Sequence, residues 1–162
     1  MLLARMANGQ PEIFASIQGE GVSTGVPSVF VRLAECPLRC SWCDTKYTWE
    51  WDHYDKAKET ITIEDTALAA RIAQAADAGT RNIVITGGEP MLQLDAPLID
   101  ALHSEGFDIG VESNGTLAAP DGIDWLCISP KADSTIVQRR GDELKLVWPQ
   151  TLADWRAMEG WD

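Results

Sequence analysis

Short apolar runs recur along this chain, and most of them end in motifs rich in Cys, Gly, Asn or Lys. Apolar runs of this length, bounded by turn residues, are typical of buried parallel strands. Segments with helical spacing lie between them, so the order predicts right-handed strand–helix–strand crossovers in one α/β domain over residues 1–162. The strands are expected at residues 29–33, 82–86, 107–112, 125–129 and 143–147.

Two helices are expected between these strands. Residues 64–78 carry apolar side chains at helical spacing, with Thr62 as the candidate N-cap and Gly79 as the stop. Residues 95–105 have an acidic start and Pro97 in the first turn, where proline is tolerated.

Three other segments have weaker patterns. Residues 12–18 are expected to pair as an added strand before the first parallel one, and residues 49–61 to form an insertion or a short helix. A last helix is expected from Thr151, with Asp154 completing a capping-box pattern.

The active and binding sites of parallel α/β proteins lie at the carboxyl ends of the strands. Each unusual motif of this sequence follows a predicted strand, so we expect one shared site. The motifs are the cysteine cluster at residues 36–43, Gly87-Gly88-Glu89-Pro90, Ser113-Asn114-Gly115-Thr116 and Ser129-Pro130-Lys131.

Three cysteines, Cys36, Cys40 and Cys43, have the spacing C-x3-C-x2-C. Thiolates are the usual ligands of iron–sulfur clusters, and three of them would leave one iron of a four-iron cluster open to a small molecule. The alternative is structural zinc, which needs a fourth ligand such as Cys127 or His53 and usually a second short ligand hairpin, which the sequence lacks. Cys127, inside an apolar run, is expected to be a buried core residue.

Composition and charge disfavour several classes of protein, among them nucleic-acid-binding, membrane and secreted proteins. With a net charge of −12 and a pI near 4.4, the chain is unsuited to a broad phosphate-binding surface, so a small-molecule substrate is favoured over nucleic acid. No apolar run approaches the roughly 18 residues of a membrane span, and residues 1–10 lack a signal-peptide pattern. Clustered thiols without a secretory signal indicate a reducing compartment, hence the cytoplasm.

The cysteine spacing, with Trp42 directly before the last cysteine, resembles that of the radical S-adenosylmethionine (SAM) superfamily. In that superfamily the three cysteines hold a [4Fe-4S] cluster, and the amine and carboxylate of SAM chelate the open iron. The motif Gly87-Gly88-Glu89-Pro90 looks like the second signature of the superfamily, which lines the methionine amino group. The resemblance implies a [4Fe-4S] cluster and SAM as cofactors.

Five further segments form one set, at residues 16–21, 30–33, 43–49, 86–90 and 129–131. In their order along the chain they resemble the 7-carboxy-7-deazaguanine synthase family, from residue 10 to about residue 149. This resemblance implies an abbreviated, partial (β/α) barrel of the radical SAM type with parallel strands. It also implies conversion of 6-carboxy-5,6,7,8-tetrahydropterin to 7-carboxy-7-deazaguanine with loss of ammonia, on the route to queuosine. Nothing matches the family's C-terminal segments, so a barrel truncated at its C-terminus is expected.

The resemblance implies roles for individual residues. Arg32 is the natural bidentate partner of the substrate carboxylate, and Thr45 matches a hydroxyl that binds Mg²⁺ beside the substrate. The residues expected to contact SAM are Trp42, Asp44, Gly88, Glu89, Asn114, Ser129, Pro130 and Lys131. Those expected to contact the pterin are Ile17, Gln18, Gly19, Glu20, Arg32 and Thr86.

Each of these assignments has a structural alternative. Arg32, in an otherwise apolar strand, would need an acidic partner. Thr45 is otherwise a turn or cap hydroxyl, Glu89 a helix-start acid and Lys131 a solvated loop residue. Asn114 is otherwise a turn residue. The tryptophans expected to be core residues are Trp49, Trp51, Trp125 and Trp148.

The expected partners are a flavodoxin- or ferredoxin-type electron donor and a second copy of the chain. An exposed parallel sheet edge invites pairing, so a homodimer is expected, and the alternative is that the chain is a fragment of a longer protein. Two other functions stay open: another radical enzyme, such as an activase that installs a glycyl radical, or a truncated domain that binds a cluster or partner without turnover. Gln18, Arg32 and Thr45 together argue against the activase.

Overall fold

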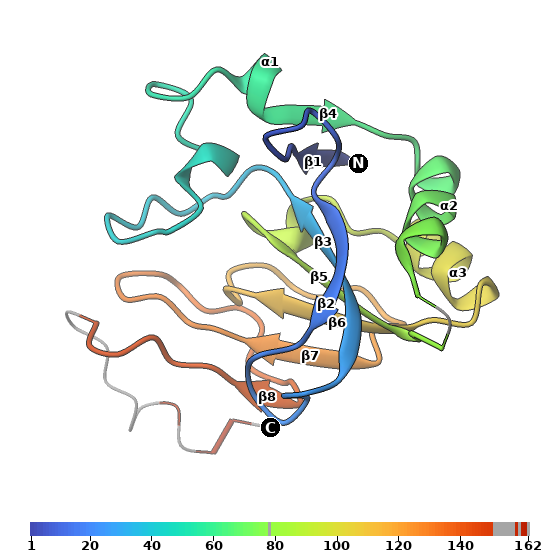
Figure 1. Cartoon of the computed structure of the whole chain (residues 1–162). Helices are drawn as coiled ribbons and strands as arrows, with labels where there is room; N and C mark the ends of the chain where they lie inside the picture. The colour runs from blue at the N-terminus through green and yellow to red at the C-terminus, as the bar shows by residue number, and fades with distance from the viewer. Residues whose placement is uncertain (78, 151–157, 159, 162) are drawn as a thin grey trace.

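One mixed β-sheet with two helices on one face dominates the structure (Figure 1). The computed structural model describes residues 1–77, 79–150, 158, 160 and 161. Within them the sheet has eight strands in the order β4-β1-β3-β5-β6-β7-β8, and β2 pairs with β3 beside that path. In this described part of the chain the end strands β4 and β8 do not pair with each other, so the barrel is partial, as predicted.

The parallel part of the sheet follows the predicted strands. Strands β3, β5, β6, β7 and β8 pair in parallel, each with the next. The last strand is shorter than predicted and ends three residues early, whereas the bounds of the others differ from the prediction by at most two residues. The strands are β3 Pro27–Leu33, β5 Asn82–Gly87, β6 Asp108–Ser113, β7 Trp125–Ile128 and β8 Glu143–Leu144.

Antiparallel strands complete the sheet on the side of β3. Strand β2, Ile13–Ile17, pairs with β3 as predicted. Strands β1, Leu2–Ala4, and β4, Thr60–Thr62, were not predicted, because three residues carry no readable alternation. The insertion predicted at residues 49–61 contains the short helix α1, Lys56–Glu59, and the first residues of β4. The 3-10 turn η1, Lys46–Thr48, precedes it.

Helix α2 spans Asp65–Ala75 with Glu64 at its N-cap position, so the predicted cap Thr62 was wrong. Thr62 pairs with Leu2 in the ladder between β4 and β1, and its backbone therefore belongs to the sheet. The helix also ends before the predicted stop at Gly79.

Helix α3, Ala96–Ser104, confirms its prediction. The Asp95 carboxylate accepts a hydrogen bond from a first-turn backbone N–H at 3.1 Å, and Pro97 lies in that turn. The helix predicted from Thr151, with Asp154 in its capping box, lies outside the described residues. No helix in the described part of the chain is both long and apolar enough to cross a membrane.

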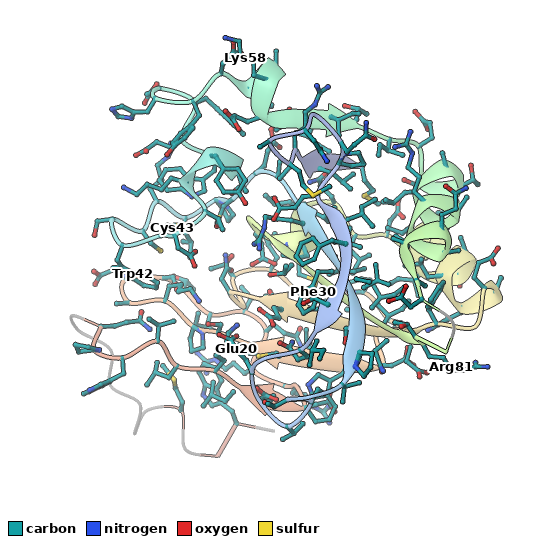
Figure 2. The ribbon with its side chains drawn as sticks, viewed as in Figure 1. Glu20, Phe30, Trp42, Cys43, Lys58 and Arg81 are labelled. Atoms are coloured by element: carbon teal, nitrogen blue, oxygen red, sulfur yellow. The ribbon has the colours of Figure 1, made fainter. Side chains whose placement is uncertain are left out.

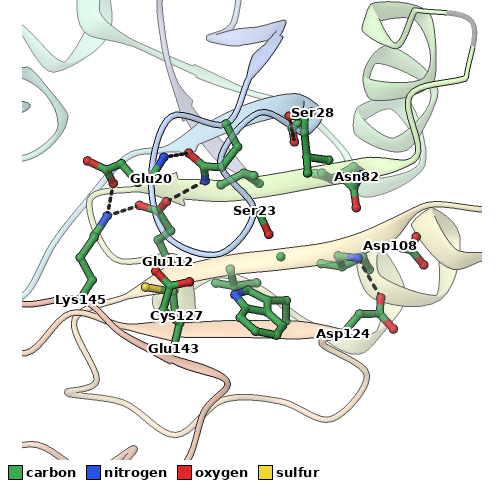
Figure 3. A pocket seen from close by; sticks show the side chains of 18 residues that line it. Glu20, Ser23, Ser28, Asn82, Asp108, Glu112, Asp124, Cys127, Glu143 and Lys145 are labelled. Carbon is green, nitrogen blue, oxygen red and sulfur yellow. Dashed lines mark hydrogen bonds and ion pairs between the residues drawn. The ribbon is translucent and has the colours of Figure 1, made fainter.

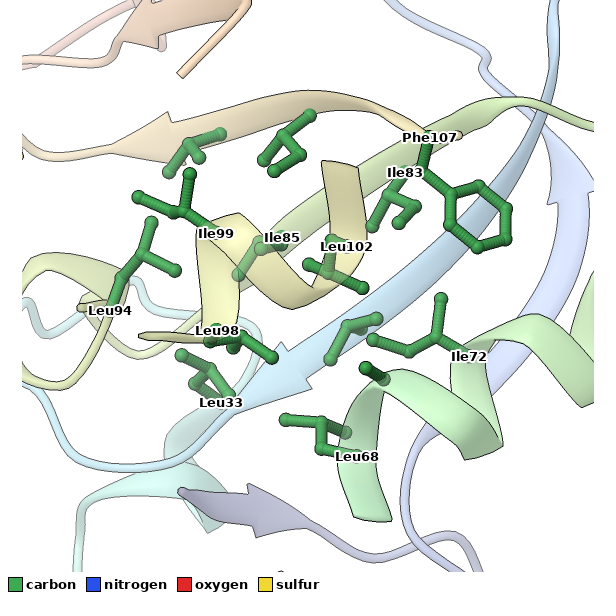
Figure 4. Packing of buried hydrophobic residues seen from close by; sticks show 14 of the residues in the cluster. Leu33, Leu68, Ile72, Ile83, Ile85, Leu94, Leu98, Ile99, Leu102 and Phe107 are labelled. Carbon is green, nitrogen blue, oxygen red and sulfur yellow. The ribbon is translucent and has the colours of Figure 1, made fainter. Parts of the chain in front are cut away.

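The hydrophobic core lies between the sheet and helices α2 and α3 (Figure 4). Because side chains alternate across a strand, every second residue of the central strands faces the helices. These residues pack with Leu68, Ile72, Leu98 and Leu102. The buried strand residues on this face include Val29, Val31, Leu33, Ile83, Ile85, Ile109, Val111, Leu126 and Ile128. The residues between them face the opposite side of the sheet.

Replacing Leu102 by Ala is expected to lower the free energy of unfolding by about 3 kcal/mol. Its side chain is 0% exposed between α3 and the sheet, so truncation leaves a cavity. Leu92→Ala, at a side chain that is 44% exposed, is the control and should change the stability by about 0.5 kcal/mol or less. Urea denaturation measures both variants, and equal losses would contradict this core.

Candidate active site

The face of the sheet away from α2 and α3 carries polar side chains near the carboxyl ends of the strands. Arg32 of β3 lies beside Thr86 of β5 in the parallel register. Both line a cavity of about 740 Å³, together with Glu112 of β6 and Ser129, which follows β7. This volume lies in the range typical of small-molecule sites.

The cavity gathers most of the residues that the sequence predicted for one site, from segments far apart in the chain. From the predicted set, the cavity is lined by Gln18, Gly19, Glu20, Arg32, Cys36, Cys40, Trp42, Cys43, Asp44, Thr45, Thr86, Gly88, Asn114, Ser129 and Lys131. Three predicted site residues do not line it: Ile17, Glu89 and Pro130.

Residues 34–45 form the loop that carries the three cysteines, and Figure 2 shows Trp42 and Cys43 on it, at the side remote from α2 and α3. Glu35, with φ of 72°, turns the chain out of β3 through a left-handed conformation that costs a non-glycine residue roughly 1 kcal/mol. Its backbone N–H donates to the carbonyl oxygen of Thr48 at 2.7 Å. This hydrogen bond ties the start of the cysteine loop to Thr48, in the turn that follows the loop.

The three thiols fit an iron–sulfur cluster better than a single metal ion. All three are free cysteines and line the same cavity. In the residues that the structure describes, no three His, Cys, Asp or Glu side chains converge on one ion position, as zinc would need. In a four-iron cluster each cysteine binds a different iron, so the sulfurs need only surround a common volume. The zinc candidates His53 and Cys127 do not line this cavity.

Side-chain donors reach two of the cysteine sulfurs. Trp49 Nε1 donates to Cys43 Sγ at 3.4 Å, and Asn114 Nδ2 donates to Cys36 Sγ at 3.8 Å. Burial raises the pKa of Cys36 to about 11 and also raises the pKa of Cys40, because a thiolate is poorly solvated there. Hydrogen bonds to sulfur favour the thiolate form. Iron binds the thiolate, so binding of a cluster would release the thiol protons.

Two glycines let the end of β5 touch the start of the cysteine loop. The backbone N–H of Gly88 donates to the Leu33 carbonyl at 2.9 Å, and that of Glu89 donates to the Glu35 carbonyl at 2.8 Å. A Cβ at Gly88 would lie 2.0 Å from the Glu35 oxygen, and one at Gly87 would lie 2.0 Å from the Leu33 oxygen. Glycine is therefore required at both positions, which gives the predicted Gly-Gly motif a physical cause.

Glu89 is buried next to the cavity rather than lining it. Its carboxylate accepts hydrogen bonds from the backbone N–H groups of Met91 and Asn114 and from Ser113 Oγ, at 2.7–3.0 Å. Burial raises the pKa of Glu89, and these hydrogen bonds oppose the rise. Glu89 thus caps the 3-10 turn η2, Pro90–Leu92, as its helix-start alternative expected, and ties that turn to the end of β6. Its contact with SAM stays a prediction.

Lys131 links the cysteine loop to the end of β7. Its Nζ donates to the backbone oxygen of Ser129 at 2.6 Å and to Ser129 Oγ at 2.5 Å, and lies 5.9 Å from the centroid of the Trp42 ring. Burial lowers the pKa of Lys131, since the ammonium is partly removed from water. The lysine is therefore a partly buried wall of the cavity rather than a freely solvated loop residue.

Arg32 has the acidic partner that its structural alternative required. Its Nε donates to Glu12 Oε1 at 2.7 Å, while Arg32 also lines the cavity. The sequence reasoning missed Glu12, whose only signal was a lone acidic residue directly before β2. Contact with the substrate stays a prediction, because the ion pair uses one of the five N–H donors of the guanidinium.

A charged cluster joins this cavity to a smaller pocket of about 80 Å³ on the same face of the sheet (Figure 3). Lys145 Nζ donates to Glu20 Oε2 at 2.9 Å and to Glu112 Oε2 at 2.7 Å, and Gln18 Nε2 donates to Glu112 Oε1 at 3.4 Å. These four residues line both spaces. The sequence reasoning missed Glu112 and Lys145, although each interrupts an apolar strand pattern.

Several predictions concern residues outside the main cavity. Cys127, 4% exposed, is confirmed as a buried residue. Trp49, 6% exposed, is also buried, but it lines the main cavity and donates to Cys43 Sγ. Trp148 is 64% exposed, so its predicted core position was wrong, because β8 before it is the last strand of the described sheet. The other two predicted core tryptophans are partly buried. The side chain of Ile17 is exposed, the Pro130 carbonyl accepts a hydrogen bond from another segment, and their ligand contacts stay predictions.

Replacing Gly88 by Ala is expected to destabilise the protein by about 2 kcal/mol, because the new methyl group must displace the Glu35 backbone. Gly19→Ala is the control for stability, since a Cβ there meets no atom within 4 Å. Thermal unfolding compares the two variants. A Gly88→Ala protein as stable as Gly19→Ala would contradict the close approach of β5 and the cysteine loop.

Comparisons with known proteins agree with this geometry. A family model described as the radical SAM superfamily matches residues 32–140. The 7-carboxy-7-deazaguanine synthase of Bradyrhizobium diazoefficiens is 46% identical over 167 residues, which cover 96% of this chain and 78% of that protein. The 7-carboxy-7-deazaguanine synthase of Caulobacter vibrioides is 44% identical, over 88% of this chain and 72% of that protein. The crystal structure of QueE from Escherichia coli matches with a TM-score of 0.64 and 33% identity, over 83% of this chain and 68% of that one.

Proposed function

The chain belongs to the 7-carboxy-7-deazaguanine synthase family of radical SAM proteins, and we propose that it converts 6-carboxy-5,6,7,8-tetrahydropterin to 7-carboxy-7-deazaguanine with loss of ammonia, a step of queuosine biosynthesis. The observation that carries this function is one cavity that joins the three cysteines to Gln18, Arg32 and Thr86. A cofactor held by the cysteine loop and a substrate held by the strands would then share one space. Such proximity is what the transfer of a hydrogen atom between them requires.

The cysteine loop supplies the cofactor side of the cavity. Cys36, Cys40 and Cys43 would hold a [4Fe-4S] cluster with one iron left for the amine and carboxylate of SAM. When bound, the cluster and SAM supply the radical that starts the reaction. Trp42 and Lys131 wall the same space, and their cation–π contact orients both side chains.

Strands β3 and β5, with the turn that follows β2, supply the substrate side. A pterin carries hydrogen-bond donors and acceptors on its edge, which suit the amide of Gln18 and the carboxylate of Glu20. Its 6-carboxylate suits a guanidinium, and Arg32 is placed beside Thr86 on the cavity wall. These polar groups orient the substrate, while the sheet behind them excludes water.

We also propose a Mg²⁺ ion at Thr45. This residue lines the cavity between the cysteine loop and the strands, with its hydroxyl 3.6 Å from Cys43 Sγ. Mg²⁺ keeps several waters and takes few protein ligands, so one hydroxyl with the substrate carboxylate suffices. A bound ion would polarise that carboxylate as a Lewis acid.

The cellular setting is part of the proposal. Free cysteines that serve a cluster need a reducing compartment, so we propose the cytoplasm and a flavodoxin- or ferredoxin-type electron donor. A homodimer is proposed because β8 ends the described sheet with an unpaired parallel edge and leaves Leu144 exposed.

Anaerobic reconstitution with iron and sulfide, followed by incubation with the pterin, SAM, Mg²⁺ and a reductant, tests the reaction. We expect 7-carboxy-7-deazaguanine, identified by mass spectrometry, from the wild-type chain and none from Cys40→Ala. That variant should also lose the visible absorbance of the cluster. Cys127→Ala changes a thiol outside the main cavity and should keep both properties. Cleavage of SAM without the deazaguanine would contradict the substrate, and turnover by Cys40→Ala would contradict the cluster.

Replacing Thr45 by Val removes the proposed Mg²⁺ ligand and keeps the shape of the side chain. We expect kcat/KM for the pterin to fall about tenfold to hundredfold and to lose its dependence on added Mg²⁺. Thr45→Ser keeps the hydroxyl and should retain the wild-type response. Steady-state assays over a Mg²⁺ titration measure both variants. An unchanged Mg²⁺ response in Thr45→Val would place the ion elsewhere.

A further inference from the structure

Glu12 lies where three parts of the fold meet, and its backbone is fixed on both sides. Its N–H donates to the Ala4 carbonyl at 2.8 Å, and its carbonyl accepts from the Arg32 N–H at 3.1 Å. The first contact ties Glu12 to β1 and the second to β3. The side chain therefore leaves a rigid point of the sheet.

The Glu12 carboxylate is shared by two side chains from different elements. Oε1 accepts from Arg32 Nε at 2.7 Å, and Oε2 accepts from the Tyr47 hydroxyl at 2.9 Å. The Glu12 side chain is 13% exposed and the Arg32 side chain 21% exposed, so water competes weakly for these contacts. One carboxylate thus joins β3 to η1, the turn that begins directly after Thr45.

The contact geometry leaves the functional end of Arg32 available. Nε is the only side-chain nitrogen of Arg32 with a hydrogen bond to the described residues, so both terminal nitrogens remain as donors. Two terminal N–H₂ groups form the fork that binds a carboxylate through two parallel hydrogen bonds. Because Arg32 lines the main cavity, that fork lies within reach of a ligand there.

The pKa shifts of Arg32 and Tyr47 agree with their contacts to Glu12. Burial by itself lowers the pKa of Arg32, but the hydrogen bond and charge of Glu12, with smaller effects of Tyr47 and Asp44, raise it overall. Burial and the Glu12 charge raise the pKa of Tyr47 to about 12, so the phenol keeps its proton and donates to Glu12. The charge and hydrogen bond of Glu12 therefore more than offset the unfavourable effect of burial on the guanidinium.

We propose that Glu12 is a positioning residue for the substrate carboxylate: it fixes the Arg32 guanidinium by its Nε, turns the two terminal nitrogens toward the cavity, and through Tyr47 sets the distance to Thr45. The proposal rests on the function proposed above and deepens it.

The test compares two ligands in the reconstituted protein with SAM and Mg²⁺ under anaerobic conditions. One is 6-carboxytetrahydropterin, and the other is a tetrahydropterin that lacks the 6-carboxylate. We expect Glu12→Ala to weaken binding of the first about tenfold to hundredfold, as for loss of a group that orients a ligand, and to change binding of the second less than twofold. Calorimetric titration measures both dissociation constants. Equal weakening of both ligands would overturn the proposal.

A double-mutant cycle adds a readout that a merely structural role would not move. If Glu12 acts through Arg32, the Glu12→Ala loss should disappear in an Arg32→Ala background. Additive losses would overturn the proposal. Glu50→Ala is the matched control, since Glu50 pairs with Lys46 at 4.0 Å and does not line the cavity.

Two further variants keep the test decisive if Glu12→Ala does not fold. Glu12→Gln retains one acceptor for Arg32 Nε and should show a smaller loss of the same selectivity, and Tyr47→Phe removes only the second contact. Unchanged selectivity in both would overturn the proposal. A wild-type protein that neither binds nor converts the pterin would instead refute the proposed function, so the two failures are distinguishable.

Discussion

Two backbone hydrogen bonds between the end of β5 and the start of the cysteine loop hold the candidate site together. The Gly88 N–H donates to the Leu33 carbonyl, and the Glu89 N–H donates to the Glu35 carbonyl. Both form only because Gly87 and Gly88 have no Cβ. The buried Glu89 carboxylate then accepts hydrogen bonds from Ser113, the last residue of β6, and from Asn114, which follows it. The ends of β3, β5 and β6 are thereby held together, and the cysteine loop begins at this point. A buried carboxylate without those donors would be costly, so the three loops depend on one another.

Because side chains alternate across the strands, the two faces of the sheet have different roles. One face supplies the apolar contacts with α2 and α3 that stabilise the fold. The other face supplies Arg32, Thr86 and Glu112 to the cavity. Because one residue of each strand separates the two sets, a change of register by one residue would exchange them. The stable core therefore fixes the positions of the polar groups.

Local patterns in the sequence were enough to predict the parallel strands, helix α3 and the motifs at the strand ends. They were not enough for contacts between distant segments. Glu12 meets Arg32 and Tyr47, and Lys145 meets Glu20 and Glu112, only after the sheet has formed. The cap of α2 was misplaced for the same reason, since Thr62 pairs with β1, a strand too short to show a readable pattern. The burial of Glu89 also depends on the neighbouring loops rather than on its own motif.

The central claim is that cofactor and substrate occupy one cavity, with the cysteine loop on one side and β3 and β5 on the other. An anaerobic crystal structure of the reconstituted protein with SAM and 6-carboxytetrahydropterin tests it most directly. We predict a four-iron cluster on Cys36, Cys40 and Cys43, SAM on its open iron, and the pterin carboxylate against Arg32 in the same cavity. A pterin bound outside this cavity, or a cluster on another set of ligands, would contradict the claim.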